Sequence, residues 1–182
     1  NEAALWPNDI SLAVNLSPLQ FRTGNLLSVV MEALNQSGLP ARRLELEITE
    51  TLLMENSEHI LATLHALRAL GVRMSMDDFG TGYSSLSYLR SFPIDKIKVD
   101  RSFVRDLAGN KDAQAILRAI IGLGRGLGVK VTAEGIETFE QLELVKRLGC
   151  TEGQGFLLGK PQSILSALAA LEKLGQVITN PN

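Results

Sequence analysis

The feature of this sequence that most constrains its fold is the alternation of apolar and charged residues within short strand-like segments. Residues 44–48 place apolar side chains at every second position, and Glu45 and Glu47 lie between them. Because successive side chains of a strand point to opposite faces, this segment has one apolar and one charged face. Residues 96–100 and 130–134 repeat the pattern. A flat sheet covered by helices on both sides needs two apolar faces, so the pattern favours a closed or nearly closed sheet with its charged face inside.

These segments alternate with helical patterns, as in chains built from βα units. The sequence predicts strands at residues 11–15, 44–48, 73–77, 96–100, 130–134 and 153–157. It predicts helices at residues 25–36, 57–70, 84–90, 112–127, 139–148 and 163–174. The expected class is therefore α/β, with the architecture of a triosephosphate-isomerase-type (TIM-type) barrel. Such barrels have eight strands and about 250 residues, so we expect an incomplete barrel with about six of the eight βα units and the first one or two strands missing. Residues 1–178 would form this partial domain, and residues 179–182 a polar tail.

Composition narrows the functional classes. The 182 residues contain 18 Lys and Arg against 20 Asp and Glu, a formal net charge of -2. This balance argues against nucleic acid as the main partner. The single cysteine, Cys150, excludes an internal disulfide framework and fits a reducing compartment. No apolar run reaches the roughly 20 residues that span a bilayer, and the first residues do not form a signal peptide. We therefore expect a cytoplasmic domain that makes no membrane contact and belongs to a longer protein.

Polar and acidic residues stand at or just after the ends of nearly all the predicted strands. They are Asn15, Glu47, Glu50, Asp77, Asp78, Asp100, Glu134, Glu137 and Gln154. In barrel enzymes the carboxyl ends of the strands converge on the active site, so these side chains are expected to meet, with Lys98 as the main internal cation. Such a cluster is costly unless protons or metal ions neutralise it, and its oxygen ligands favour magnesium, manganese or calcium over zinc. The plainer interpretation is that the glutamates of residues 44–48 are surface charges of an edge strand, Asp78 forms a turn and Glu134 caps a helix.

Paired divalent ions held by carboxylates suit the hydrolysis of phosphoric esters, because they activate a water and stabilise the attacking and leaving oxygens. A lysine among carboxylates keeps its proton, since the neighbouring anions favour its charged form. Lys98 is thus better suited to orienting a water or neutralising a phosphate than to forming a Schiff base.

Several sequence stretches together resemble the EAL domain, a bacterial phosphodiesterase that opens cyclic di-GMP to linear pGpG. They are Val14-Asn15-Leu16-Ser17, Leu46-Glu47-Ile48-Thr49-Glu50, the run from Asp77 to Leu86, the run from Lys98 to Val104, Ala133-Glu134-Gly135-Ile136-Glu137-Thr138, and Gln154-Gly155-Phe156 followed by Pro161. They occur in the order typical of the family and cover nearly the whole chain. Each is weak alone, and together they are specific.

The resemblance implies a role for each matching residue. Direct metal ligands would be Asn15, Glu47, Asp77 and Glu134, and Asp78 would serve the second metal or its water. Lys98 would position the attacking water, Asp100 would line the site, and Glu137 and Gln154 would complete the shell around water and substrate. Glu50 would anchor the loop of residues 78–85, in which Gly80 allows unusual backbone angles. The family also implies Mg²⁺ or Mn²⁺ as cofactor, inhibition by Ca²⁺, a homodimer, and attached regulatory domains.

One departure from the family concerns its signature. The Glu-Ala-Leu strand precedes the Asn-Leu-Ser strand in EAL domains, whereas Glu32-Ala33-Leu34 here falls within the predicted helix at residues 25–36 and is a coincidence. We expect the signature strand, with its metal-binding glutamate and a nearby phosphate-contacting arginine, to be missing from this sequence. The fragment is therefore expected to be weakly active or inactive even if the parent domain is active. Two alternatives stay open: a non-catalytic receptor for cyclic di-GMP, and an unrelated barrel enzyme such as a lysine-dependent aldolase using Lys98.

Overall fold

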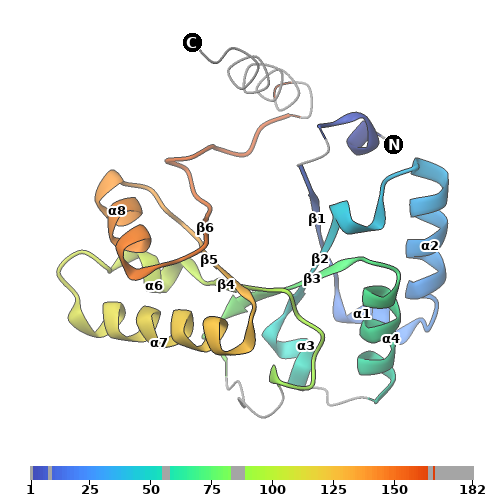
Figure 1. The fold of residues 1–182 in the computed structure, drawn as a ribbon, viewed down its shortest axis with the longest axis horizontal. Coiled ribbons are helices and arrows are strands. Elements are labelled where there is room, and N and C mark those ends of the chain that lie inside the picture. Colours follow the sequence, from blue (N-terminus) through green and yellow to red (C-terminus); the bar gives the residue numbers. More distant parts are fainter. Residues whose placement is uncertain (1, 8–9, 55–57, 83–88, 164–165, 167–182) are drawn as a thin grey trace.

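Six parallel strands form one curved sheet, in which each strand pairs with its neighbours in chain order. The strands are β1 (Leu12–Asn15), β2 (Leu44–Thr49), β3 (Arg73–Phe79), β4 (Lys96–Val99), β5 (Lys130–Ala133) and β6 (Glu152–Gly153). The computed structural model describes residues 2–7, 10–54, 58–82, 89–163 and 166. Within these residues β1 and β6 are the two edges, so the sheet is a half-barrel (Figure 1). The predicted α/β class and the incomplete barrel are confirmed.

The helices follow the strands and cover the outer face of the sheet (Figure 1). They are α1 (Pro18–Arg22), α2 (Leu26–Ser37), α3 (Glu50–Met54), α4 (Glu58–Ala69), α6 (Arg101–Arg105), α7 (Lys111–Leu127) and α8 (Phe139–Leu148), with 3₁₀ turns η1 (Glu2–Leu5) and η2 (Ala41–Arg43). Left-handed glycines end α2, α7 and α8 at Gly38, Gly128 and Gly149. No helix in the described ranges combines the length and the apolar content needed to cross a bilayer.

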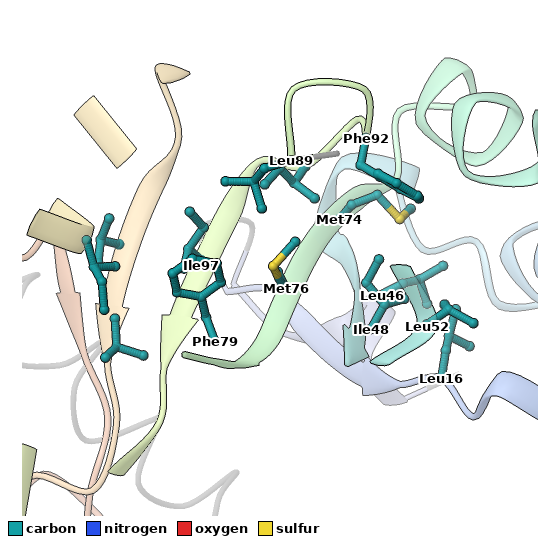
Figure 2. Packing of buried hydrophobic residues seen from close by; sticks show 14 of the residues in the cluster. Leu16, Leu46, Ile48, Leu52, Met74, Met76, Phe79, Leu89, Phe92 and Ile97 are labelled. Atoms are coloured by element: carbon teal, nitrogen blue, oxygen red, sulfur yellow. The ribbon is translucent and has the colours of Figure 1, made fainter. Parts of the chain in front are cut away.

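The apolar faces of the strands form the core against the helices. Ile48, Met74, Met76 and Ile97 are fully buried there, and Figure 2 shows them in one layer. On the opposite face of the sheet, Glu45, Glu47 and Lys98 are also buried although they are charged. The alternation in the sequence therefore placed both layers correctly. Gly124 of α7 completes the packing, because a Cβ there would lie 2.3 Å from Val131 Cγ2 of β5.

Some predicted boundaries are wrong. The last strand ends at Gly153 rather than at residue 157, because the chain then turns to hydrogen-bond Ile136: Ile136 N donates to Gln154 O, and Leu157 N donates to Ile136 O. The sequence analysis also missed α1, α3 and α6, which have five residues each, too few for a helical period to be recognised. Two predicted helices, at residues 84–90 and 163–174, lie mostly outside the described residues. The first residue of the predicted helix at 57–70 lies outside them as well.

Candidate active site

Three carboxylates from three strands meet around one lysine at the carboxyl end of the sheet. The Lys98 ammonium on β4 lies 3.0 Å from Glu47 Oε2 on β2, 2.9 Å from Asp77 Oδ1 on β3 and 2.8 Å from Glu134 Oε1 just after β5. The Lys98 residue is only 5% exposed. The parallel order of the strands produces this arrangement, since it aligns the ends of β2, β3, β4 and β5 along one rim.

Asp77 and Asp78 both reach this rim, although consecutive residues of a regular strand point to opposite faces. The pairing of β3 with β4 shifts register between Met76 and Phe79, and Asp78 has a positive φ of 54°. Asparagine and aspartate tolerate such angles better than most residues, and a bulge of this kind redirects a side chain. As a result, carboxylate oxygens of Asp77, Asp78 and Glu134 lie within 4.8 Å of one another.

The cluster carries more negative than positive charge. Burial raises the pKa of Glu134, and the nearby Asp77 and Glu47 add to this while Lys98 opposes it. Burial and then the charge of Asp77 raise the pKa of Asp78. Burial alone lowers the pKa of Lys98, but hydrogen bonds to Glu134 and Asp77 outweigh it, so the ammonium is held above its ordinary pKa. A dense set of oxygen donors with surplus negative charge fits a hard divalent cation.

A cavity of about 720 Å³ adjoins the cluster. Six residues singled out in the sequence line it: Asp78, Asp100, Glu134, Glu137, Gln154 and Pro161. The Asp100 carboxylate also accepts a hydrogen bond from Ser102 N, at 3.0 Å, as the N-cap of α6. Burial raises the pKa of Asp100, but the hydrogen bonds from Ser102 outweigh this and lower it. The cavity thus includes one carboxylate, Asp100, whose lowered pKa favours its ionised form.

Glu50 holds the loop that follows β3. Its Oε2 accepts hydrogen bonds from Gly80 N at 3.1 Å and Gly82 N at 3.3 Å, and its side chain is buried. Gly80 has a φ of 98°, and a Cβ there would lie 2.8 Å from the Phe103 ring, so the loop needs glycine at this position. Residues 83–85 of this loop lie outside the described ranges.

Asn15 lies at the edge of this arrangement. It is paired in register with Glu47, at the end of β1, and is exposed. The half-barrel leaves its β1 side uncovered in the described part of the chain.

Several residues around the site were not indicated by the sequence pattern. Arg101, Lys160 and Gln162 line the cavity, and Lys160 Nζ lies 5.9 Å from the centre of the Phe156 ring. The alternation in residues 96–100 also placed Lys96 on the same inward face as Lys98 but gave it no role, and in the structure Lys96 ion-pairs with Glu45 at 2.9 Å.

Comparison with known proteins agrees with the fold and the motifs. The sequence profile described as the EAL domain matches residues 1–161. The bifunctional diguanylate cyclase/cyclic di-GMP phosphodiesterase MucR of Pseudomonas aeruginosa is 47% identical over 163 residues, which are 90% of this chain and 24% of MucR. The chain thus spans about a quarter of that relative's length.

Solved structures give the same result. The phosphodiesterase of PaMucR in complex with c-di-GMP has a TM-score of 0.86 and 46% identity, covering 91% of this chain and 74% of that one. BlrP1 of Klebsiella pneumoniae, in a manganese/cyclic di-GMP complex, has a TM-score of 0.76 and 37% identity, covering 81% of this chain and 38% of that one. From its motifs, its half-barrel and these matches, the chain belongs to the EAL domain family.

Proposed function

We propose that this chain is part of a metal-dependent phosphodiesterase that hydrolyses cyclic di-GMP to linear pGpG. The observation that carries the proposal is the cluster around Lys98, in which acidic side chains from neighbouring strands meet beside a cavity of about 720 Å³. This volume lies within the range of about 300–1,000 Å³ that is usual for small-molecule sites. Relatives named as phosphodiesterases and structures in complex with c-di-GMP support the choice of substrate.

The residues that would hold Mg²⁺ or Mn²⁺ are Asn15, Glu47, Asp77 and Glu134, with Asp78 serving a second ion or its water. The three carboxylates that lie within 4.8 Å of one another support the assignment of Asp77, Asp78 and Glu134, and the manganese complex of BlrP1 supports a divalent metal site. Divalent ions held by these residues would activate a water and would stabilise the charge that develops on the phosphate. Ca²⁺, which is larger and binds with more flexible geometry, is expected to inhibit.

The protein side chains then position the reactants. Lys98 keeps its proton, so it would orient the attacking water or neutralise a phosphate oxygen once a bound metal ion takes over one of its three carboxylate partners, and it would not act as a nucleophile. Asp100, Glu137 and Gln154 line the cavity and would orient the water and the substrate. Glu50 would keep the loop after β3 in place beside the rim through its two backbone hydrogen bonds.

The assembly is part of the proposal. We expect a homodimer, since the family links the loop of residues 78–85 to dimerisation, and we expect regulatory domains in the protein that carries this chain. MucR, whose name describes two activities, supports the second expectation. Light scattering with and without Mn²⁺ tests the first, and a monomer under both conditions would contradict it.

The decisive experiment incubates cyclic di-GMP with the protein that carries this chain, in Mg²⁺, Mn²⁺ or Ca²⁺, and separates pGpG by chromatography. We expect product with the first two ions and little with Ca²⁺. Asp77→Asn and Glu134→Gln should each reduce turnover by at least about tenfold, since they remove expected ligands. Glu143→Gln is the matched control, because Glu143 lies exposed on α8.

Two results would overturn the proposal. Binding of cyclic di-GMP without any product would favour a receptor, and trapping of a carbonyl substrate on Lys98 by borohydride would favour an aldolase. For the 182 residues alone we expect weak or no turnover. Robust turnover by these 182 residues would contradict this expectation.

A further inference from the structure

A groove between α7 and α8, on the outside of the half-barrel, is lined by three arginines. Arg118 and Arg125 lie on α7 and Arg147 lies on α8, around a hollow of about 400 Å³. All three residues are exposed. The other residues that line the groove are Gln114, Ile121, Gly122, Leu144 and Leu148, and none of them is acidic. The groove is therefore positively charged in a chain whose net charge is -2.

The positive charge of the groove is not neutralised within the described residues. None of the three guanidinium groups makes an ion pair or a side-chain hydrogen bond there, whereas other surface cations do: Lys146 pairs with Glu143 at 3.2 Å and Arg105 with Asp106 at 3.2 Å. A helix C-terminus attracts cations, and this accounts for arginines in the last turns of α7 and α8. It does not account for Arg118, which lies more than two turns before the end of α7.

The groove has an apolar floor as well as charged walls. Ile121 is buried, and Leu144 and Leu148 are half-buried. Gly122 lines the groove on the α7 side without a side chain, and a Cβ there would meet no atom within 4 Å, so the groove is open at this position. Arg118 and Arg125 are seven residues apart on one helix, so their backbone positions differ by about 10.5 Å along its axis. The two arginines of α7 therefore leave the helix about two turns apart along the groove.

We propose that this groove is a docking surface for an acidic protein segment that carries an apolar anchor residue. Guanidinium groups bind carboxylates in a bidentate manner, and several carboxylates along a peptide match the spacing of the arginines better than one compact phosphate does. The apolar floor accommodates the anchor. Nucleic acid fits less well, because no aromatic side chain lines the groove to stack on a base.

The test uses a fluorescein-labelled peptide of glutamate and aspartate with one leucine, and measures its binding to the full chain by fluorescence anisotropy. The same peptide with glutamine and asparagine in place of the acids is the ligand control. The triple variant Arg118→Gln, Arg125→Gln, Arg147→Gln should weaken binding about tenfold, as expected when three exposed ion pairs are lost. A second triple variant, Arg42→Gln, Arg90→Gln, Lys111→Gln, removes the same charge from exposed positions elsewhere and should change binding less than about twofold.

A steric variant separates docking in the groove from general charge attraction. Gly122→Phe places a ring over the groove without changing the charge, and it should also weaken binding about tenfold. Gly126→Phe is its matched control: Gly126 lies on the same helix, a Cβ there also meets no atom within 4 Å, and it does not line the groove. Thermal unfolding followed by circular dichroism verifies that all variants are folded.

Four outcomes overturn the proposal. They are no binding of the acidic peptide, equal losses in the two triple variants, undiminished binding to Gly122→Phe, and displacement of the peptide by a single-stranded RNA oligonucleotide of higher affinity. Losses confined to the arginine triple variant and Gly122→Phe support it.

Discussion

Glu152, the first residue of β6, offers a quantitative test of how charges inside the half-barrel contribute to stability. Its Oε1 lies 2.7 Å from Lys130 Nζ and its Oε2 lies 2.8 Å from Lys96 Nζ. Burial raises the pKa of the Glu152 carboxyl, but the hydrogen bonds from Lys130 and Lys96 outweigh this and lower it to about 2. The ionised carboxylate therefore stabilises the folded state.

The magnitude follows from the difference between the ordinary pKa of 4.5 and the folded value of about 2. At about 1.36 kcal/mol per pH unit this difference sets a ceiling of about 3.4 kcal/mol. The Glu152 side chain is 32% exposed, so solvent screening reduces the expected contribution to about 1–2 kcal/mol. Because the folded pKa is depressed, the contribution is complete above pH 4.5 and is lost as the pH falls from 4.5 towards 2.

Urea unfolding of the wild-type protein and of Glu152→Gln measures this contribution. We expect the substitution to lower the free energy of unfolding by about 1–2 kcal/mol at neutral pH, and by less than half of that at about pH 3. Comparing the two proteins at each pH cancels the titration of the other carboxylates. Glu143→Gln is the control, because the Glu143 side chain is 63% exposed in its pair with Lys146, and it should change stability little at either pH. An equal loss for Glu152→Gln at both pH values would refute the electrostatic reasoning.

Three further substitutions test other contacts. Gly155→Ala places a Cβ 2.1 Å from Ile136 O, a clash with backbone that no side-chain motion relieves. The free energy of unfolding, measured by thermal unfolding, should therefore fall by about 3 kcal/mol or more. An unchanged melting temperature would contradict the turn after β6. Lys98→Met leaves three carboxylates without their shared cation. Urea unfolding with EDTA present should show a free energy of unfolding lower by about 3 kcal/mol. Equal stability of the two proteins would mean that the three carboxylates are protonated or well hydrated. Glu50→Ala should accelerate amide hydrogen exchange at Gly80 while exchange in the core strands stays unchanged, and equal acceleration throughout would indicate global destabilisation instead.

The sequence predicted the sheet well because periodicity of two is a strong local signal. Apolar and charged residues alternate in β2, β4 and β5, and the burial of Ile48, Glu47 and Lys98 follows from that alternation alone. The end of β6 could not be read in this way. It depends on the backbone contact between Gly155 and Ile136, which are far enough apart in sequence that no local pattern records the contact.

The site could be predicted in part. Residue types at the strand ends indicated that Asp77, Glu134 and Lys98 would meet, and they lie together in the structure. The sequence did not reveal how Asp78 joins them, since strand alternation places it on the opposite face from Asp77. The register shift in β3 and the positive φ of Asp78 resolve this, and both are products of tertiary pairing with β4.

The inner face of the sheet also explains why its chemistry lies at one end. Lys96 and Lys98 stand two residues apart on β4 and define two charged layers. In the layer nearer the amino ends of the strands, two cations pair with two anions: Lys96 and Lys130 with Glu45 and Glu152. In the layer nearer the carboxyl ends, Lys98 is the one cation that contacts three anions, Glu47, Asp77 and Glu134. A fourth anion, Asp78, lies beside them. A balanced layer can stabilise the fold without any ligand, whereas the unbalanced layer retains surplus negative charge that a divalent cation would neutralise. The balance of charge, and not the number of ionisable groups, therefore distinguishes the structural layer from the layer proposed to act in catalysis.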